Sequence, residues 1–547
     1  MDGRLRTVTM GILAALGAAC ASGTGGASGG AAAVAGGVRP AAIAGEGGPA
    51  LRAIDYRLAI AEPAAHLFDV TLDVDGVHSL GGALALELPV WSPGRYARVD
   101  FARNVQTFSA TADGHPLAWE KTGGSSWRVA TGGADRVRVH YRVFANALSG
   151  TYSVLDTAHA NWNGAGLFMY VAGHKADPVR LTLEVPDGWQ VMSGDAADFA
   201  QREFRFENYD RLIDTPTEVA PGITVDSFTV DDRIYRVMVH HNGPRPQGAR
   251  ERFVRDVQRI VQTENRVIAP PPLKRYTFLF NLGYAGGDGM EHLFSTEIIS
   301  AQPWVDSARV LSGISTASHE YFHTWNVKRM RPVALGPFDY TQAQHQPSLW
   351  VAEGWTQYYG DMTLHRSGIV PKSQLYATLG RVIQYTSTTP ARKERSPRAA
   401  SFDAPFFDGA RAPMPVNSEA TTVSYYLSGE MRALALDLMI RSATNGTKSL
   451  DDVLRSLKRR SWDAPNATYY LQGRGYPEAD VEAAASEVYG KDLHDWFTRY
   501  VGGTEDLPWN DILALAGLRL DGAALTELPD ASAAAVQVRD GWLAGAR

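Results

Sequence analysis

The decisive stretch of this 547-residue chain is His319-Glu320-Tyr321-Phe322-His323. It places two imidazoles four residues apart, with a carboxylate beside the first. Residues i and i+4 lie on one face of a helix, so both imidazoles can converge on one metal ion. Glu320 then lies where a carboxylate can accept a proton from metal-bound water. Because the chain has only 14 histidines, chance would produce H-E-x-x-H about 0.02 times. The stretch therefore predicts a metal-binding helix.

A catalytic zinc needs a third protein ligand and leaves its fourth position to water. The candidate is Glu353, thirty residues after His323, at the start of a second predicted helix over residues 352–364. An isolated glutamate in such a place could instead be a solvated acid that stabilises a helix N-terminus. Trp350 and Trp355 flank Glu353 and suit a buried wall, which favours the ligand. The sequence predicts one zinc ion per chain, bound by His319, His323 and Glu353.

Length and composition exclude several classes of protein. Hydrophobic residues at 45% and charged residues at 20% are typical of globular proteins. The length allows about three or four domains of ordinary size. The net charge of −6 and the lack of a long basic run make nucleic acid an unsuitable partner.

The N-terminus is typical of an export signal over residues 1–20. Arg4 and Arg6 precede an apolar run that is too short to span a bilayer. Cys20 is the only cysteine, which excludes an intramolecular disulfide. Two alternatives stay open: cleavage after Ala21 at an A-x-A pattern, or lipidation of Cys20 as in bacterial lipoproteins. Both export the protein to the periplasm or cell envelope, and the second attaches it to the membrane. Residues 21–50 are rich in glycine and alanine and predict a flexible tether.

Residues 51–226 show strand patterns. Alternation of apolar and polar residues is strict over Val137–Val143 and partial over Leu67–Val74 and Leu181–Val185. Turn signals such as Pro186-Asp187-Gly188 separate such runs. We expect a β-sandwich-like domain without a catalytic motif.

Residues 227–508 predict a mixed α/β region that becomes mainly helical after Glu353. Residues 388–420 predict a long loop over the surface or the cleft. His240 and His241 are neighbours on a predicted strand and point to opposite faces, so they are not expected to share a metal. The predicted elements are strands over residues 234–240 and 276–280 and helices over residues 247–268, 372–386, 429–441, 450–460, 478–489 and 493–501.

Beyond the metal motif, the chain resembles the zinc-dependent glycyl aminopeptidases of the gluzincin group over most of residues 51–510. The motifs that carry the resemblance are Trp91-Ser92-Pro93-Gly94-Arg95-Tyr96, Arg103-Asn104-Val105, Gly289-Met290-Glu291-His292, the metal motif extended through Arg329, and Ser424-Tyr425-Tyr426 followed by Gly429. The resemblance implies a multidomain α+β fold: a β-sandwich-like N-terminal domain and a thermolysin-like zinc peptidase domain with a helical C-terminal lobe.

The resemblance also implies a PDZ domain at the C-terminal end. Residues 509–547 are too few for such a domain of about 90 residues. We expect them to be a C-terminal tail that begins the linker to a PDZ domain. Ser428 stands where related aminopeptidases often carry a lysine.

Roles for the site residues follow from the resemblance. Glu320 is the expected general base. Tyr426 is expected to donate a hydrogen bond to the oxyanion. The alternative for Tyr426 is a core aromatic residue at the start of a helix. Glu291 is expected to bind the α-ammonium group of a peptide substrate, with Gly289 and Met290 beside it. For Glu291 the alternative is an acid after a glycine turn.

The expected function is that of an exported zinc aminopeptidase that releases glycine or alanine from the N-terminus of peptides. Two other functions stay open. The first is a zinc endopeptidase of the cell envelope, and the second is a non-catalytic envelope binding protein on a peptidase scaffold.

Overall fold

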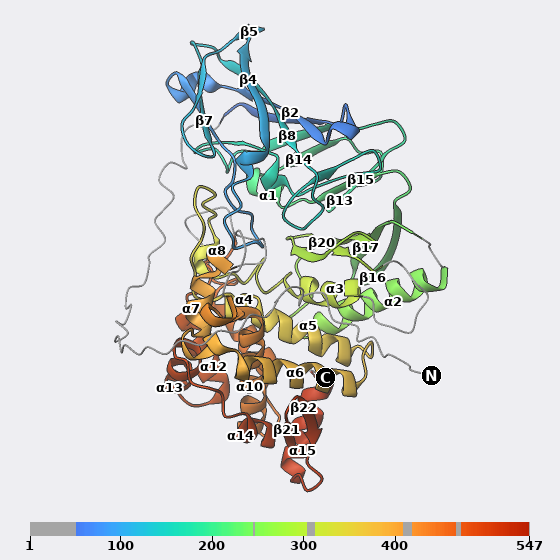
Figure 1. The fold of residues 1–547 in the computed structure, drawn as a ribbon, viewed down its shortest axis with the longest axis vertical. Helices are drawn as coiled ribbons and strands as arrows, with labels where there is room; N and C mark the ends of the chain where they lie inside the picture. The colour runs from blue at the N-terminus through green and yellow to red at the C-terminus, as the bar shows by residue number, and fades with distance from the viewer. Residues whose placement is uncertain (1–50, 244–246, 303–311, 408–417, 466–471, 546–547) are drawn as a thin grey trace, which may run out of the picture.

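The computed structural model describes residues 51–243, 247–302, 312–407, 418–465 and 472–545. Within these ranges a β-rich N-terminal region is followed by a mixed α/β lobe and then by helices (Figure 1). This mixed α+β architecture agrees with the fold class that the sequence predicts. The predicted export signal with Cys20 and the predicted tether lie outside the described residues.

The N-terminal region contains three sheets, with strand orders β14-β12-β1-β2-β8-β4-β5, β11-β3-β7-β6 and β13-β15-β10-β9. Its strands are β1 (Ala53–Ala59), β2 (Leu67–Asp75), β3 (Ala83–Glu87), β4 (Val105–Ala112), β5 (His115–Pro116), β6 (Trp119–Lys121), β7 (Ser126–Ala130), β8 (Arg136–Phe144), β9 (Val154–Leu155), β10 (Ala160–Trp162), β11 (Tyr170–Val171), β12 (Val179–Glu184), β13 (Gln190–Ser193), β14 (Glu203–Phe206) and β15 (Thr217–Ala220), with one short helix, α1 (Tyr209–Ile213).

Burial along β8 explains the alternating sequence. Val137, Val139, Tyr141 and Val143 are buried, and the residues between them face outward. The same side chains pack against β2, which pairs with β8 along its whole length. The alternation predicted a half-buried strand, and this prediction is confirmed.

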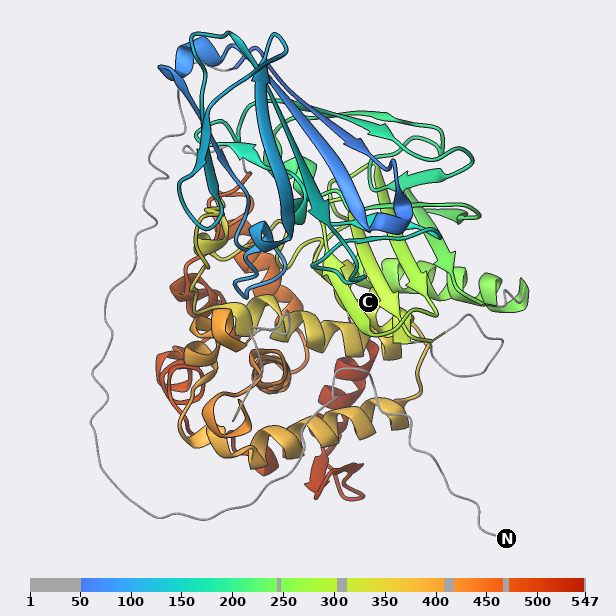
Figure 2. The ribbon, with the colours of Figure 1, turned by 45° about the horizontal axis from the view of Figure 1, so that its top comes forward.

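A five-stranded sheet with the order β16-β17-β18-β20-β19 forms the centre of the second lobe. Strands β17, β18 and β20 are parallel, and β16 and β19 are antiparallel edge strands. Figures 1 and 2 show this sheet between the N-terminal strands and helices α2 and α3. The bounds are β16 (Thr224–Val230), β17 (Arg233–His241), α2 (Gln247–Glu264), β18 (Arg275–Leu282), β19 (Gly287–Glu291), β20 (Ser295–Ser300) and α3 (Ser312–Phe322). The domain boundary proposed after residue 226 falls inside β16.

Helix α2 covers the sheet with one apolar face. Phe253, Val257, Ile260 and Val261 recur at helical spacing and are buried. They belong to one core cluster with the strands of the sheet and with Tyr321 of α3. This packing orients α3, so the metal-binding helix rests on a continuous hydrophobic core.

The last lobe is helical. Its elements are α4 (Leu349–Ala352), α5 (Gly354–Arg366), α6 (Lys372–Thr388), α7 (Pro397–Phe402), α8 (Ala404–Phe407), α9 (Ser418–Thr421), α10 (Tyr425–Ala443), α11 (Leu450–Arg460), α12 (Glu478–Tyr489), α13 (His494–Phe497) and α14 (Trp509–Ala514). Helices α11 and α12 have the predicted bounds. Of the helices in the described ranges, none combines the length and apolar character needed to cross a bilayer.

The predicted long loop over residues 388–420 is wrong where the structure describes it. Residues 397–407 form α7 and α8, and 418–421 form α9, while 408–417 lie outside the described residues. Ser396 caps α7 by accepting a hydrogen bond from the Ala399 amide at 3.1 Å, and Pro397 occupies its first position. Serine followed by proline is a helix start signal, and it outweighs the loop-like composition of the segment.

Residues 509–547, expected to be a tail, contain packed structure. After α14 come β21 (Leu518–Asp521), β22 (Ala524–Glu527) and α15 (Ala533–Ala544). Trp542 of α15 is fully buried, and its ring N–H donates to the hydroxyl of Tyr358 in α5 at 2.9 Å. The hairpin and α15 are therefore part of the helical lobe.

Candidate metal centre

The two imidazoles of the metal motif converge as their spacing predicts. Helix α3 ends at Phe322, and His323 lies in the turn that follows rather than within the helix. The Nε2 atoms of His319 and His323 are 3.1 Å apart, and His323 is fully buried. The motif thus brings both ring nitrogens to one point, although α3 ends one residue before His323.

Glu353 completes a triangle with these nitrogens. Its Oε2 lies 3.4 Å from Nε2 of His319 and 3.4 Å from Nε2 of His323. Ligand atoms bonded to a tetrahedral zinc are about 3.3–3.6 Å from one another. Glu353 occupies a break between α4 and α5. The structure therefore brings the three predicted ligands together around one point.

Asn326 connects the two halves of this triangle. Its carbonyl accepts a hydrogen bond from His323 Nδ1 at 2.6 Å and another from the Thr356 hydroxyl at 3.0 Å. Its side-chain amide donates to the carbonyl of Val351 at 2.9 Å. These bonds tie the turn after α3 to α4 and α5, and so hold His323 next to Glu353.

The protonation of His323 shows what the triangle can bind. In the neutral form that a metal ligand needs, an Nδ1 that donates to a carbonyl leaves the lone pair of His323 on Nε2. That lone pair faces a second imidazole nitrogen and a carboxylate oxygen, and a cation between them satisfies all three. Two imidazoles and one carboxylate form a donor set that suits zinc. The residues present therefore fit a divalent metal.

Close helix packing determines how near α5 approaches α3. A β-carbon added to Gly360 of α5 would stand 3.3 Å from the backbone of His319. The Ser318 hydroxyl donates to the Gly360 carbonyl at 2.9 Å. Any side chain at position 360 would push α5 away from α3.

Glu320 lies beside the triangle, as predicted. Its carboxylate is buried, and Oε2 has no hydrogen-bond partner among the described residues. Burial raises the pKa of Glu320 well above its ordinary value, although the charge of His323 opposes this shift. One ligand atom from each of Glu320, Glu291 and His323 lies within 4.8 Å of the others. A carboxyl group that is poorly solvated and close to the metal is suited to proton transfer.

Strand β19 borders the site with Gly289, Met290 and Glu291. Met290 and Glu291 are buried, and Oε1 of Glu291 has no hydrogen-bond partner in the described part of the chain. A β-carbon on Gly94, which has φ +89°, would stand 2.7 Å from Oε2 of Glu291. A loop of the N-terminal region therefore covers this carboxylate.

Tyr426 occupies the first turn of α10. The Ser424 hydroxyl caps this helix by accepting from the Leu427 amide at 3.3 Å. The ring centroid of Tyr426 lies 6.1 Å from that of His319, and the Tyr425 ring stacks on it at 4.8 Å. The helix thus brings the half-buried Tyr426 to the metal-binding histidines.

Sequence reasoning assigned no role to Tyr96, which belongs to the Trp91–Tyr96 motif of the N-terminal region. Its hydroxyl donates to Oε1 of Glu353, the carboxylate oxygen that does not face the imidazoles. Arg95 pairs with Asp288 and donates to the Gly289 carbonyl at 3.2 Å. The Trp91–Tyr96 motif, which is one of the motifs that carry the resemblance, is the sequence signal that could have pointed to the contact between Tyr96 and Glu353.

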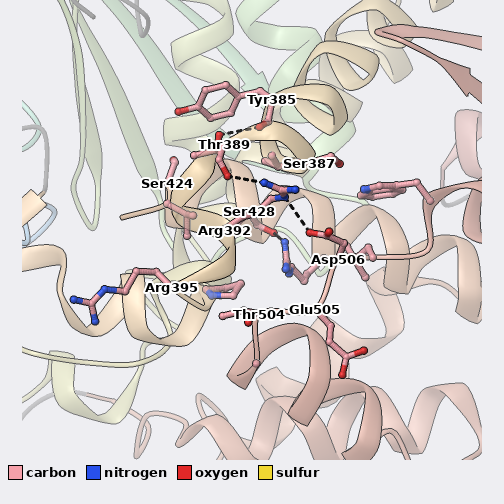
Figure 3. Close-up of a pocket in the computed structure, with 17 residues that line it drawn as sticks. Tyr385, Ser387, Thr389, Arg392, Arg395, Ser424, Ser428, Thr504, Glu505 and Asp506 are labelled. Atoms are coloured by element: carbon pink, nitrogen blue, oxygen red, sulfur yellow. Dashed lines mark hydrogen bonds and ion pairs between the residues drawn. The ribbon is translucent and has the colours of Figure 1, made fainter. Parts of the chain in front are cut away.

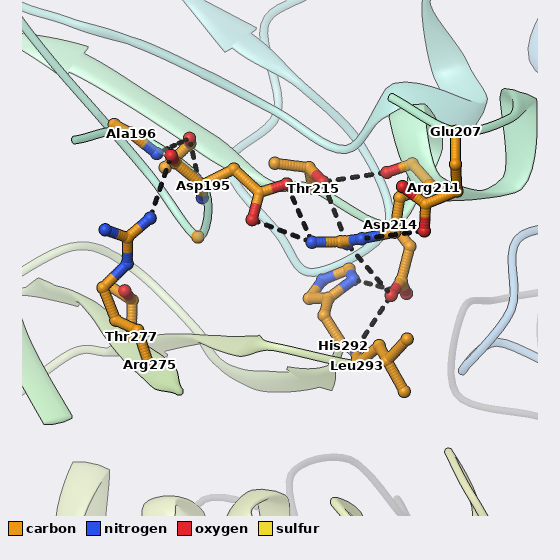
Figure 4. A network of polar contacts seen from close by, with 12 residues as sticks. Asp195, Ala196, Glu207, Arg211, Asp214, Thr215, Arg275, Thr277, His292 and Leu293 are labelled. Carbon is orange, nitrogen blue, oxygen red and sulfur yellow. Dashed lines mark hydrogen bonds and ion pairs between the residues drawn. The ribbon is translucent and has the colours of Figure 1, made fainter. Parts of the chain in front are cut away.

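A polar network joins the N-terminal region to the five-stranded sheet through residues that include Arg211, Asp214 and His292 (Figure 4). Asp214 accepts from the Leu293 amide at 2.8 Å, from His292 Nδ1 at 3.1 Å and from Lys328 at 2.8 Å. Burial opposes ionisation of Asp214, but Lys328 and His292 outweigh burial and hold the pKa of Asp214 below its ordinary range. The network thus holds His292, the residue that follows Glu291, in place.

A second cluster, His159–Glu218–His240, lies between the N-terminal region and the same sheet. Nδ1 of each imidazole is 2.9 Å from Oε1 of Glu218, and all three residues are buried. These separations are those of charge-assisted hydrogen bonds, and both imidazoles share one carboxylate oxygen. We interpret the cluster as an ion pair. His240 faces Glu218, whereas its neighbour His241 contacts the Gly243 carbonyl at 2.9 Å.

A small cavity of about 40 Å³ lies on another face of α10 (Figure 3). Ser424 and Ser428 line it, but the metal-binding residues and Tyr426 do not. Residues 424 and 428 share one helix face, and residue 426 points the other way. Arg392, which also lines the cavity, forms an ion pair with Asp506 at 3.2 Å. The cavity is thus separate from the metal centre.

Models of two protein domains match this chain. The peptidase M61 N-terminal domain matches residues 55–221, and the M61 glycyl aminopeptidase domain matches residues 312–431. The second match contains the metal triangle, Glu320 and Tyr426. No curated protein matches the chain.

Solved structures share the fold. An aminopeptidase N family protein from Idiomarina loihiensis is 26% identical, with a TM-score of 0.76 over 85% of this chain and 78% of that chain. A mutant M1 zinc metallopeptidase from Deinococcus radiodurans is 14% identical, with a TM-score of 0.50 over 84% of this chain and 95% of that chain.

The two family matches fall on the β-rich N-terminal region and on the lobes that form the metal centre. With a peptidase-type arrangement of two histidines and two glutamates inside the second match, the chain belongs to the M61 peptidases and is a peptidase.

Proposed function

We propose that this protein is an exported zinc aminopeptidase that removes glycine or alanine from the N-terminus of peptides. The observation that carries the proposal is the triangle of His319 Nε2, His323 Nε2 and Glu353 Oε2, with sides of 3.1–3.4 Å. The buried carboxylates of Glu320 and Glu291 lie beside it. The description of the matching family as glycyl aminopeptidase supports the reaction and the small N-terminal residue.

One zinc ion per chain fits this donor set. When bound, zinc polarises the scissile carbonyl and makes a water molecule nucleophilic at neutral pH. Glu320 accepts the proton of the attacking water and then delivers it to the leaving amine. Its buried carboxylate has an oxygen within 4.8 Å of a ring nitrogen of His323, so it lies within reach of a water at the metal.

Glu291 makes the enzyme an exopeptidase. A buried carboxylate forms a charge-assisted hydrogen bond with the α-ammonium group of a peptide and so selects a free N-terminus. Its strand β19 is an edge of the sheet, where an extended peptide can pair with the backbone. Gly94 packs closely against Met290 and Glu291. The small space that this leaves beside the carboxylate supports selection of glycine or alanine.

Tyr426 stabilises the oxyanion. A phenol beside the metal donates a hydrogen bond to the carbonyl oxygen as negative charge develops there. The helix N-terminus holds this residue near His319, with Tyr425 stacked on its ring. Tyr425 packs against Tyr96 instead, and we assign it no chemical role.

Export rests on the N-terminal sequence. Arg4, Arg6 and the apolar run after them are typical of a signal peptide. Lipidation of Cys20 would attach the enzyme to a membrane of the cell envelope. Fractionation of cells that express wild type or Cys20→Ser tests this step: loss of the membrane-bound form in the variant indicates lipidation, and an unchanged distribution indicates a cleaved signal.

The function is tested by metal analysis of the purified protein together with hydrolysis assays. Glycyl, alanyl and bulky aminoacyl anilides are compared, each with a free and with an acetylated N-terminus. We expect zinc in the protein and much faster cleavage of free glycyl and alanyl anilides than of their acetylated or bulky counterparts. Equally fast cleavage of acetylated peptides would instead indicate an endopeptidase. Bound zinc without any hydrolysis would indicate a binding protein on a peptidase scaffold.

A further inference from the structure

We propose that Tyr96 is a positioning residue for Glu353, so that the N-terminal β-rich region completes the metal centre. This inference rests on one part of the proposed function, namely that Glu353 is a metal ligand. It assigns a task to a residue that lies 257 positions away from that ligand in the sequence.

The two oxygens of the Glu353 carboxylate face different partners. Oε2 lies 3.4 Å from each imidazole Nε2, whereas Oε1 accepts the hydrogen bond of the Tyr96 hydroxyl. Glu353 and Tyr96 are each only 2% exposed. Water is therefore scarce around Oε1, and the phenol supplies its hydrogen bond. The phenol thereby turns Oε2 toward the metal and favours one-oxygen ligation.

The loop that carries Tyr96 is held on both sides. The ring N–H of buried Trp91 donates to the Asp339 carbonyl at 2.6 Å. Arg95 Nε donates to the Thr151 hydroxyl at 2.7 Å, and the same guanidinium pairs with Asp288 in β19. The Tyr96 hydroxyl is thus fixed relative to the N-terminal region and to the catalytic sheet together.

A residue that orients a metal ligand affects metal affinity before it affects chemistry. Loss of such partners typically weakens metal binding by about 10–100-fold. Without the phenol, Oε1 of Glu353 is left buried without a donor, and the carboxylate can rotate away from the imidazoles. Tyr96→Phe keeps the ring and removes only the hydroxyl, so it isolates this effect.

The experiment compares Tyr96→Phe with Tyr56→Phe. Tyr56 is a matched control because it is a buried phenol of the same region, with its hydroxyl on the Met169 carbonyl at 2.7 Å. Affinity for Zn²⁺ is measured by competition of the metal-free protein with a chelator, and folding by thermal unfolding of the same metal-free protein. Tyr96→Met, a second side chain without a donor, replaces Tyr96→Phe if the latter does not fold.

We expect Tyr96→Phe to bind Zn²⁺ about 10–100-fold more weakly than wild type, and Tyr56→Phe to keep the wild-type affinity. Excess zinc should restore most of the activity of Tyr96→Phe. Affinities within twofold of each other for wild type and Tyr96→Phe would overturn the inference. Wild-type protein that binds no zinc would refute the proposed function itself, which is a separate outcome.

Discussion

Gly289 of β19 lies directly against the carboxylate of Glu320. A β-carbon built on Gly289 would stand 2.1 Å from Oε1 of Glu320 and 2.7 Å from the Thr316 side chain. No side chain fits between the strand and α3 at this point. The edge strand of the sheet and the proposed general base are therefore in contact, and glycine is the residue that permits it.

Gly289→Ala should displace Glu320 from the metal centre. We expect kcat to fall by at least about 10-fold, because a misplaced base loses much of the 10²–10⁴-fold contribution of proton transfer. Zinc content should stay at the wild-type level, since the atoms nearest to the added β-carbon belong to Glu320 and Thr316 rather than to a metal ligand. Gly124→Ala, at an exposed position of the N-terminal region with open space around it and no positive φ, controls for general effects. A fully active Gly289→Ala would show that Glu320 tolerates displacement.

Glu320→Gln should retain zinc and lose catalysis. Glutamine has the shape of glutamate but cannot accept and return the proton, so we expect kcat to fall by about 10²–10⁴-fold. Metal analysis and steady-state kinetics on a glycyl anilide measure the two effects separately. Near-normal turnover would remove Glu320 from its role, and loss of zinc would make it a ligand.

Glu291→Ala should abolish the preference for a free N-terminus. A hydrogen bond to a charged group contributes about 1.5–3 kcal/mol, so kcat/KM for free-amine substrates should fall by about 10–150-fold. Acetylated substrates, which have no ammonium group, should be unaffected. Glu120→Ala removes an exposed acid of β6 and is the control. Equal losses on free and acetylated substrates would indicate a structural role for Glu291.

Tyr426→Phe and Tyr425→Phe should behave differently. Removal of one well-aimed oxyanion donor costs about 10²–10³-fold in kcat, and we expect this loss for Tyr426→Phe with little change in KM. Tyr425→Phe keeps the stacked ring and should retain most of kcat. Rate constants for the two variants decide the assignment, because the opposite pattern would make Tyr425 the donor.

The His159–Glu218–His240 cluster predicts a pH-dependent stability. The imidazoles of His159 and His240 outweigh the effect of burial and lower the pKa of Glu218 from 4.5 to about 2. The stability contributed by Glu218 is thus complete above pH 4.5 and is lost as the pH falls toward 2. Burial opposes the charge on His159, but Glu218 outweighs it and raises the pKa of His159 above 6.5. That contribution is complete below pH 6.5 and is lost as the pH rises through the raised pKa.

Glu218→Gln should therefore lower Tm most between pH 4.5 and 6.5. The nearby Glu297 adds to the decline as the pH rises. Burial and the charge of Glu218 raise its pKa from 4.5 to about 8, so the stability that protonated Glu297 contributes is complete below pH 4.5 and is lost between pH 4.5 and about 8. Thermal unfolding of wild type and variant across pH 3–9 measures the difference in Tm. A difference that does not change with pH would contradict the ion-pair interpretation.

Local sequence accounts for much of the fold. Helix α11 begins where Ser449 and Asp452 form a capping box, and α12 ends where Gly490 adopts a left-handed conformation. Such signals act within a few residues, so the bounds of both helices could be predicted. The segment 397–407 was missed because its composition suggested a loop, although Ser396 and Pro397 carried a helix start signal.

What the sequence by itself determined is the metal motif: the spacing of His319 and His323 puts both imidazoles on one point, and the tryptophans around Glu353 indicated a buried third ligand. Tertiary structure alone decided that Tyr96 binds Glu353 and that Glu218 joins His159 to His240. The physical reason is distance along the chain. Helix and strand periodicity relates residues a few positions apart, whereas these contacts arise only when the N-terminal sheets pack against the catalytic lobe.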